Sequence, residues 1–155
     1  MGTKFSTRVW VSVVGIASIF FGSKGYADTV ISVADFGLKP DTRENAVAYV
    51  QKAIEACRGK EPVTLVFPEG RYDFWPQYAH EKNYYETNTY DVFPKRLAML
   101  FEGLHNITVD GNGSQFVMHD RIQPITVENC DGVTLKNFSI DWDIPLTAQA
   151  RVTKV

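Results

Sequence analysis

The feature that most constrains the fold is a repeat between residues 99 and 142. A shift of 26 residues places the segment Phe101–Val109 on the segment Val127–Leu135, and the glutamate and threonine of the first copy recur in the second. Each copy has a short apolar strand, a polar corner with Gly or Asn, and a second short strand. Periods of about 20 to 50 residues are typical of stacked-coil proteins. We therefore expect an all-β fold, a parallel β-helix in which the two segments are successive coils.

Composition places the chain among globular proteins and excludes nucleic-acid binding. Its 155 residues are 45% hydrophobic and carry a formal net charge of -2, without the basic stripe that binds DNA or RNA. The histidines His80, His105 and His119 have no spacing typical of metal ligands. The sequence therefore predicts no nucleic-acid partner, no metal and no cofactor.

Residues 1–27 have the pattern of a secretory signal peptide. Lys4 and Arg8 form a basic start, residues 9–21 are apolar, and Gly25–Ala27 is a small-x-small cleavage site. The apolar run is too short to span a membrane. We expect export to a periplasmic or extracellular space, no membrane span after cleavage, and a mature domain over residues 28–155.

The two cysteines are Cys57 and Cys130. An exported protein is able to pair them. Cys57, however, ends a predicted helix and Cys130 lies at a coil corner, which favours two separate small side chains over a disulfide.

The mature chain begins with a predicted strand at 29–33 and a turn at 35–42. A helix follows, which Asp41 or Thr42 is expected to cap and Gly59 to end. Its apolar positions keep the 3.6-residue period. These positions are Ala46, Val47, Val50, Ala53, Ile54 and Cys57.

An aromatic-rich segment runs from Tyr72 to Phe93. It keeps neither a strand nor a helix period for long, which indicates a structured loop with a helical turn. Aromatic rings beside charged and amide groups suit both the apolar face and the hydroxyls of a sugar. Two interpretations stay open: the rings cover the flank of the coils, or they contact carbohydrate, with Trp75 and His80 as candidate contacts.

The cluster Asp141, Trp142 and Asp143 follows the predicted strand 138–140. Alternate strand residues point to one side, so the two aspartates are expected about 6.5 to 7 Å apart at Cα. Inverting glycosidases separate their carboxyl groups by about 6.5 to 9.5 Å. Any Asp-x-Asp on a strand meets this condition, so an exposed corner pair is the alternative. We predict these three residues as substrate contacts.

Two further acidic positions are predicted to be structural. Glu102 and Glu128 recur at the same place in the two copies, so they are expected to stack, and their repulsion is expected to raise the pKa of one of them. The run Asp110–Gly113 is expected to bend the chain between two faces of a coil.

The order of these elements resembles the N-terminal entry of the pectin-lyase-like right-handed β-helices. The shared motifs are Asp35-Phe36-Gly37, the helix pattern at 46–54, and Phe-Pro-Glu-Gly-x-Tyr at 67–72. The resemblance implies a right-handed parallel β-helix, or solenoid, with an N-terminal capping α-helix over its first coil.

More narrowly, the chain resembles the N-terminal part of the bacterial α-1,3-galactosidases of glycoside hydrolase family 110. The runs that carry the resemblance are 67–80, 84–88 and 141–145, and it covers Asp28 to Val155. It implies an exo-acting, inverting enzyme without a metal that removes terminal α-1,3-linked galactose from blood group B type glycans. The family carries its two catalytic aspartates on later coils, so the catalytic residues are expected beyond Val155.

Removal of 27 of the 155 residues leaves 128, and the strand-like pattern at 151–155 has no polar cap of the kind that ends a solenoid. We therefore expect an incomplete β-helix that hydrolyses nothing by itself. A pectin-type hydrolase or lyase and a non-catalytic carbohydrate-binding β-helix are the alternatives. The sequence makes no prediction of oligomeric state.

Overall fold

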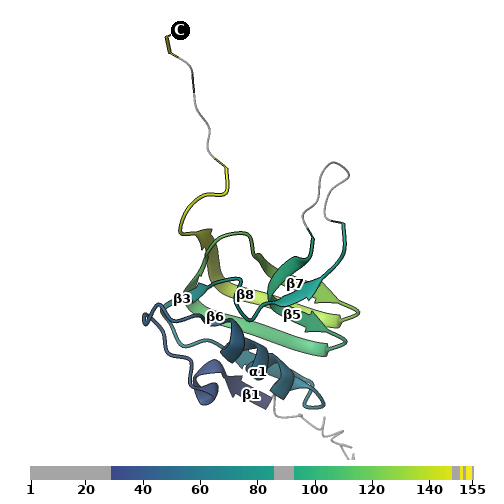
Figure 1. Ribbon diagram of the computed structural model, residues 1–155. Helices are drawn as coiled ribbons and strands as arrows, with labels where there is room; N and C mark the ends of the chain where they lie inside the picture. The colour runs from purple at the N-terminus through teal and green to yellow at the C-terminus, as the bar shows by residue number, and fades with distance from the viewer. Residues whose placement is uncertain (1–28, 86–92, 148–150, 152, 155) are drawn as a thin grey trace, which may run out of the picture.

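The computed structural model describes residues 29–85, 93–147, 151, 153 and 154. The predicted signal peptide, part of the aromatic segment and most of the final residues lie outside these ranges. Within them the chain is mainly β, with its strands in largely parallel sheets and little helix (Figure 1). This arrangement agrees with the expected all-β class. No helix in these ranges is long and apolar enough to cross a membrane.

The larger sheet contains five parallel strands. β6 (His105–Met118) is its centre, and it pairs through its first half with β2 (Val63–Val66) and through its second half with β3 (Arg71–Phe74). β1 (Thr29–Ser32) pairs with β2 on the outer side. β8 (Asp131–Trp142) pairs with β6 along its length, so successive passes of the chain lie on one another.

The smaller sheet contains β4 (His80–Lys82), β5 (Lys95–Glu102) and β7 (Gln123–Glu128). β5 and β7 are parallel, whereas β4 runs antiparallel to β5. The prediction of a loop for the whole aromatic segment was therefore wrong in two places. Its first residues, Tyr72 to Phe74, continue β3, and its middle forms β4, whose backbone groups pair with the edge of β5.

The strand register confirms the 26-residue repeat. Phe101 pairs with Val127 in the smaller sheet, and Val109 pairs with Leu135 in the larger one. The repeated residues thus lie directly on one another. The spacing falls to 24 after Asp110, because the first copy has three residues, 111–113, where the second has only Asn137.

The polar corners repeat in backbone conformation as well. Gly103 and Asn129, one repeat apart, have φ of 64° and 51°, and Asn106 and Gly132 have φ of 48° and 68°. All four adopt the left-handed conformation, which Gly and Asn tolerate better than other residues. The two coils exchange Gly and Asn between the two positions and still make the same corner.

The helix α1 (Val47–Cys57) lies over β1, β2 and β5 at one end of the stack (Figure 1). All six predicted apolar positions are buried, with exposures of 0 to 3%. The helix begins later than predicted, because Asp41 and Arg43 have positive φ and cannot be helical. The Thr42 hydroxyl instead accepts a hydrogen bond from the Glu44 amide, at 3.3 Å.

Aromatic rings fill the interior of successive coils. Phe67, which follows β2, lies 4.8 Å from Phe116 of β6 between ring centroids, and Phe116 lies 4.8 Å from Phe138 of β8. The three rings thus form one continuous column, although they do not occupy paired register positions, since Phe116 pairs with Ile140 and Phe138 pairs with Ser114. Cys57 and Cys130 are separate free thiols, the first buried and the second half-buried.

Inward-facing side chains of β5 and β6 are less exposed than those of β7 and β8. Phe101, Val109 and Phe116 are 0 to 1% exposed, because β7 and β8 cover them. Their partners Val127 and Leu135 are 45% and 39% exposed, since no described strand lies beyond β7 or β8. The outermost described strands, β7 and β8, therefore present apolar side chains without a covering layer among the described residues.

Candidate functional site

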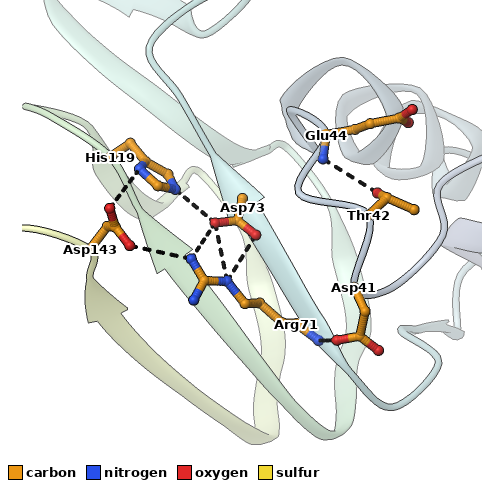
Figure 2. A network of polar contacts seen from close by, with 7 residues as sticks. All are labelled: Asp41, Thr42, Glu44, Arg71, Asp73, His119 and Asp143. Carbon is orange, nitrogen blue, oxygen red and sulfur yellow. Dashed lines mark hydrogen bonds and ion pairs between the residues drawn. The ribbon is translucent and has the colours of Figure 1, made fainter.

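A network of charged side chains centres on Asp73 of β3, whose side chain is fully buried (Figure 2). Nη2 of Arg71 lies 2.6 Å from Oδ1 of Asp73, and Nε of Arg71 lies 3.0 Å from Oδ2. Nε2 of His119 lies 2.7 Å from the same Oδ1. The buried carboxylate is thus fully engaged by two neighbouring side chains.

Asp143 is the solvent-facing member of the network, with a side chain 42% exposed. Its Oδ1 lies 3.4 Å from Nη2 of Arg71, and its Oδ2 lies 3.8 Å from Nδ1 of His119. Arg71 and His119 therefore both bridge the buried carboxylate of Asp73 to the exposed carboxylate of Asp143 (Figure 2).

The stacking of three strands brings these groups together. Phe74 pairs with Met118, and Met118 pairs with Trp142, so these three residues lie side by side on neighbouring strands. The residues that directly follow them form a row next to them. This row is Trp75, His119 and Asp143. The rings of Trp75 and His119 stack, with centroids 3.9 Å apart and planes 7° from parallel.

Electrostatics hold the buried pair in its charged form. Burial alone would raise the pKa of Asp73, but hydrogen bonds from Arg71 and His119 outweigh it and leave that pKa below its ordinary value. The hydrogen bond to Asp73 raises the pKa of Arg71 in turn. Asp73 is therefore an anion at neutral pH and has no proton to donate.

The network is anchored to the segment that precedes the helix. The backbone amide of Arg71 donates to Oδ1 of Asp41 at 2.9 Å, and the amide of Ala46 donates to the carbonyl of Asp73 at 2.8 Å. Oδ1 of Asn45 accepts from the amides of both Val47 and Trp75. The start of α1 and the end of β3 are thus fixed to each other.

The structure brings together two of the five predicted contact residues. Asp143 and Trp75 both contact His119. Asp141 is exposed and accepts a hydrogen bond from the Trp142 amide at 2.8 Å, outside the network. The Trp142 ring packs against the core, and its Nε1 is buried without a hydrogen-bond partner among the described residues.

The fifth predicted residue, His80, lies on β4. It lines a cavity of about 200 Å³ between α1 and the smaller sheet, together with Arg58 and Glu102. None of the described contacts joins it to the network around Asp73.

Arg71, Asp73 and His119 were not predicted from the sequence as a unit. An Arg-x-Asp pair on a strand places both side chains on one face, which is a readable signal. His119 could not be added to it, because that step requires knowing that β3 stacks on the second half of β6.

A second ionic cluster confirms the predicted stacking of Glu102 and Glu128, which are register partners. Nζ of Lys82 lies 2.8 Å from Oε1 of Glu102 and 2.5 Å from Oε2 of Glu128. The expected rise in the pKa of one of the two glutamates is not found at Glu102. The hydrogen bond from Lys82 lowers the pKa of Glu102, because the cation offsets the repulsion between the two carboxylates.

The corner at 110–113 joins two coils. Oδ1 of Asp110 accepts from the Asn112 amide at 2.9 Å and from Nδ2 of Asn137 at 3.0 Å, and Lys136 lies 3.3 Å from Oδ2. These bonds link β6 to β8 at a register irregularity inside β6, where Asn112 and Gly113 have positive φ. Within residues 29–85 and 93–147, no group of His, Cys, Asp and Glu side chains is arranged to hold a metal ion.

Comparison with known proteins identifies relatives of the chain. No family model matches it. It is 63% identical over 128 residues to α-1,3-galactosidase B of Bacteroides thetaiotaomicron, covering 83% of this chain and 21% of the relative. It is 40% identical over 125 residues to α-1,3-galactosidase A of Shewanella woodyi, covering 81% and 20%. For an α-1,3-galactosidase B of Phocaeicola vulgatus the identity is 37% over 148 residues, covering 93% and 23%.

Parallel strands stacked in register, together with these relatives, place the chain in the class of glycosidase-related β proteins. Within that class it is a homologue of the α-1,3-galactosidases, as the resemblance of glycoside hydrolase family 110 implied, and it is consistent with their N-terminal part. It spans about a fifth of the length of these relatives.

Proposed function

We propose that the complete protein is an exo-acting α-1,3-galactosidase and that this chain forms the N-terminal start of its catalytic domain. The observation that carries the proposal is the 63% identity over 128 residues to a protein named α-1,3-galactosidase B. Its substrate, on this proposal, is terminal α-1,3-linked galactose of blood group B type glycans.

The architecture proposed for that domain is a right-handed parallel β-helix. Two facts support it: parallel strands repeat in register at a spacing of 26 residues, and α1 covers one end of the stack. The exposed apolar residues Val127 and Leu135 would then be covered by the next coil, as β7 and β8 cover Phe101 and Val109.

The proposed reaction proceeds with inversion. One carboxylic acid protonates the departing glycosidic oxygen, and a carboxylate about 6.5 to 9.5 Å away activates water on the opposite face of the sugar. Asp73 is unsuited to either role, because it is buried, ionised and bonded to Arg71 and His119. We place both catalytic carboxylates on coils after Val155.

Asp143 and Trp75 have a proposed role in substrate contact. The Asp143 carboxylate is exposed and held in place by Arg71, so it is able to accept hydrogen bonds from sugar hydroxyls. The half-buried Trp75 ring is positioned by its stack on His119 and offers an aromatic surface beside that carboxylate. Asp141, Trp142 and His80 stay predictions.

The test compares three substrates with the complete product of the reading frame: B-type trisaccharide, a linear α-1,3-galactobiose and polygalacturonate. The proposal expects galactose release from the trisaccharide, with β-galactose as the first anomer seen by NMR. Residues 28–155 alone are expected to release none. Unsaturated uronate would identify a lyase, and glycan binding without turnover would identify a binding module.

Export is part of the proposal. Cleavage after Ala27 is expected to give a mature protein that begins at Asp28 in the periplasm or medium. N-terminal sequencing of the protein from these fractions tests it, and an intact Met1 in the cytoplasm would contradict it.

A further inference from the structure

A groove of about 630 Å³ lies where the end of β4 faces β7, and it shares no residue with the network around Asp73. Its described lining comes from two short segments. These are Glu81, Lys82, Asn83 and Tyr84 on one side and Thr126, Val127 and Glu128 on the other. The groove therefore lies between the aromatic segment and the second copy of the repeat.

Thr126 provides an unused polar group in this groove. Its Oγ1 is buried and has no hydrogen-bond partner among the described residues. Ile125 packs against the core, so strand alternation places the side chains of Thr126 and Glu128 on the opposite face of β7. Buried hydroxyls in native proteins are generally satisfied by protein, water or ligand. The Thr126 hydroxyl thus lacks, among the described residues, the partner that such a group normally has, and Thr126 is part of the groove lining.

The other lining groups match the chemistry of a sugar. The half-buried ring of Tyr84 offers an apolar surface for the C–H face of a pyranose. The amide of Asn83 and the carboxylates of Glu81 and Glu128 offer acceptors and donors for its hydroxyls.

The charges of the groove favour a neutral sugar. Lys82 is already paired with Glu102 and Glu128, and Glu81 is paired with Arg96, whose Nε lies 3.4 Å from Oε1 of Glu81. A neutral sugar needs no counter-charge in the groove, whereas an anionic uronate would find the cations Lys82 and Arg96 already paired with carboxylates.

We propose that this groove is a second glycan-binding site, which takes a neutral galactosyl unit away from the catalytic coils. The choice of galactose rests on the proposed function. The described lining of the groove lies on and beside β4 and β7, apart from the network around Asp73, so the groove would hold a neighbouring galactosyl unit of a larger glycan and take no part in bond cleavage.

The test is a calorimetric titration of the complete protein with methyl α-D-galactopyranoside, comparing wild type with Thr126→Val. The variant is expected to lose one binding equivalent per chain, or to bind there with a Kd about fivefold higher, since valine keeps the shape and loses the hydroxyl. Its Tm is expected to be equal or higher, because the hydroxyl has no partner in the free protein. Thr134→Val, on an exposed part of β8, is the matched control and is expected to bind as wild type.

A second pair of variants tests the aromatic surface. Tyr84→Phe is expected to keep the binding and Tyr84→Ala to lose it, with galactose release from B-type trisaccharide unchanged in both. A photoreactive galactoside is expected to label the peptides that contain residues 81–84 and 126–128.

The proposal is overturned if Thr126→Val binds the galactoside with unchanged stoichiometry and Kd, or if label is absent from both peptides. It is also overturned if galacturonate competes as well as galactose for the groove. If the complete wild-type protein binds the galactoside in the groove but releases no galactose from B-type trisaccharide, the proposed function is refuted and the proposed binding site is retained.

Discussion

The buried carboxylate of Asp73 lies 2.7 Å from Nε2 of His119, a residue 46 positions later in the chain. The contact joins the ends of β3 and β6, and Arg71 and Asp143 extend it to the end of β8. Three successive coils are therefore tied together at one corner by charge, at the place where the exposed carboxylate of Asp143 is presented.

Replacement of Asp73 by Asn is expected to destabilise the protein by about 3 kcal/mol at pH 7, because it removes the anion from a buried ion pair and leaves Arg71 with only the exposed carboxylate of Asp143, at 3.4 Å. Chemical denaturation of wild type and variant measures the loss. Asp131→Asn is the matched control on an exposed part of β8 and is expected to change stability little. A similar cost for both substitutions would contradict a special role for the buried pair.

The same carboxylate gives the protein a specific acid sensitivity. The folded-state pKa of Asp73 is lowered, so its contribution to stability is present above the unfolded value of about 4 and is lost as the pH falls through the folded value. Wild-type Tm is therefore expected to fall below about pH 4 more steeply than the Tm of Asp73→Asn. Parallel curves for the two proteins would show that other groups dominate.

Gly103 and Gly132 are expected to differ in their tolerance of asparagine. At position 103 a Cβ would meet only Nη1 of Arg58, at 3.9 Å, and the equivalent residue of the next coil is already Asn129. At position 132 it would lie 2.6 Å from Oδ1 of Asn106 and 3.3 Å from the Asn106 backbone nitrogen. Gly103→Asn is thus expected to cost less than about 1 kcal/mol, and Gly132→Asn to cost more.

Thermal or urea unfolding of the two glycine variants provides the measurement. The substitution is the same in both and both positions have positive φ, so backbone strain is matched and the difference reports the contact with Asn106. Equal losses would indicate that φ alone sets the cost at these corners.

Removal of Lys82 is expected to make the coil stack sensitive to pH. Without its cation, Glu102 and Glu128 face each other as like charges at register positions. Lys82→Met should therefore lower Tm at neutral pH, and the difference from wild type should shrink at acid pH, where protonation of Glu102 removes the repulsion.

A compensating substitution checks the cause. Lys82→Met combined with Glu128→Gln should recover part of the Tm at pH 7, and added salt should narrow the gap for the single variant. A loss that is equal at every pH and unaffected by Glu128→Gln would point to packing of the lysine stem instead.

The parts of the fold that were predictable are those with a local period. The buried face of the helix was predictable because its apolar residues recur every three or four positions. The pairing of β5 with β7 was predictable because Phe101 and its neighbours recur 26 residues later, at Val127 and its neighbours. The first residue of the helix was not predictable. Asp41 and Thr42 are residue types that commonly cap helices, but Asp41 and Arg43 adopt the left-handed conformation, which excludes a helix there.

The network around Asp73 lay beyond sequence reasoning for a geometric reason. β3 stacks on β6 at a spacing of 44 residues, since Arg71 pairs with Gln115, whereas β6 stacks on β8 at 26 and then 24. The aromatic segment enlarges one coil and breaks the period. Only the fold shows that Trp75, His119 and Asp143 occupy one row.

The two cysteines are expected to react with iodoacetamide in a fixed order. Cys57 is fully buried, and burial raises the pKa of its thiol to about 11, so little thiolate forms near pH 8. Cys130 is half-buried and free. Peptide mapping of the native protein should therefore find label on Cys130 and none on Cys57, and both should be labelled in urea. Cys130→Ser is the control for peptide assignment. A resistance of both residues to labelling in urea without reductant would show that they are joined, which would require the helix end and the coil corner to move together.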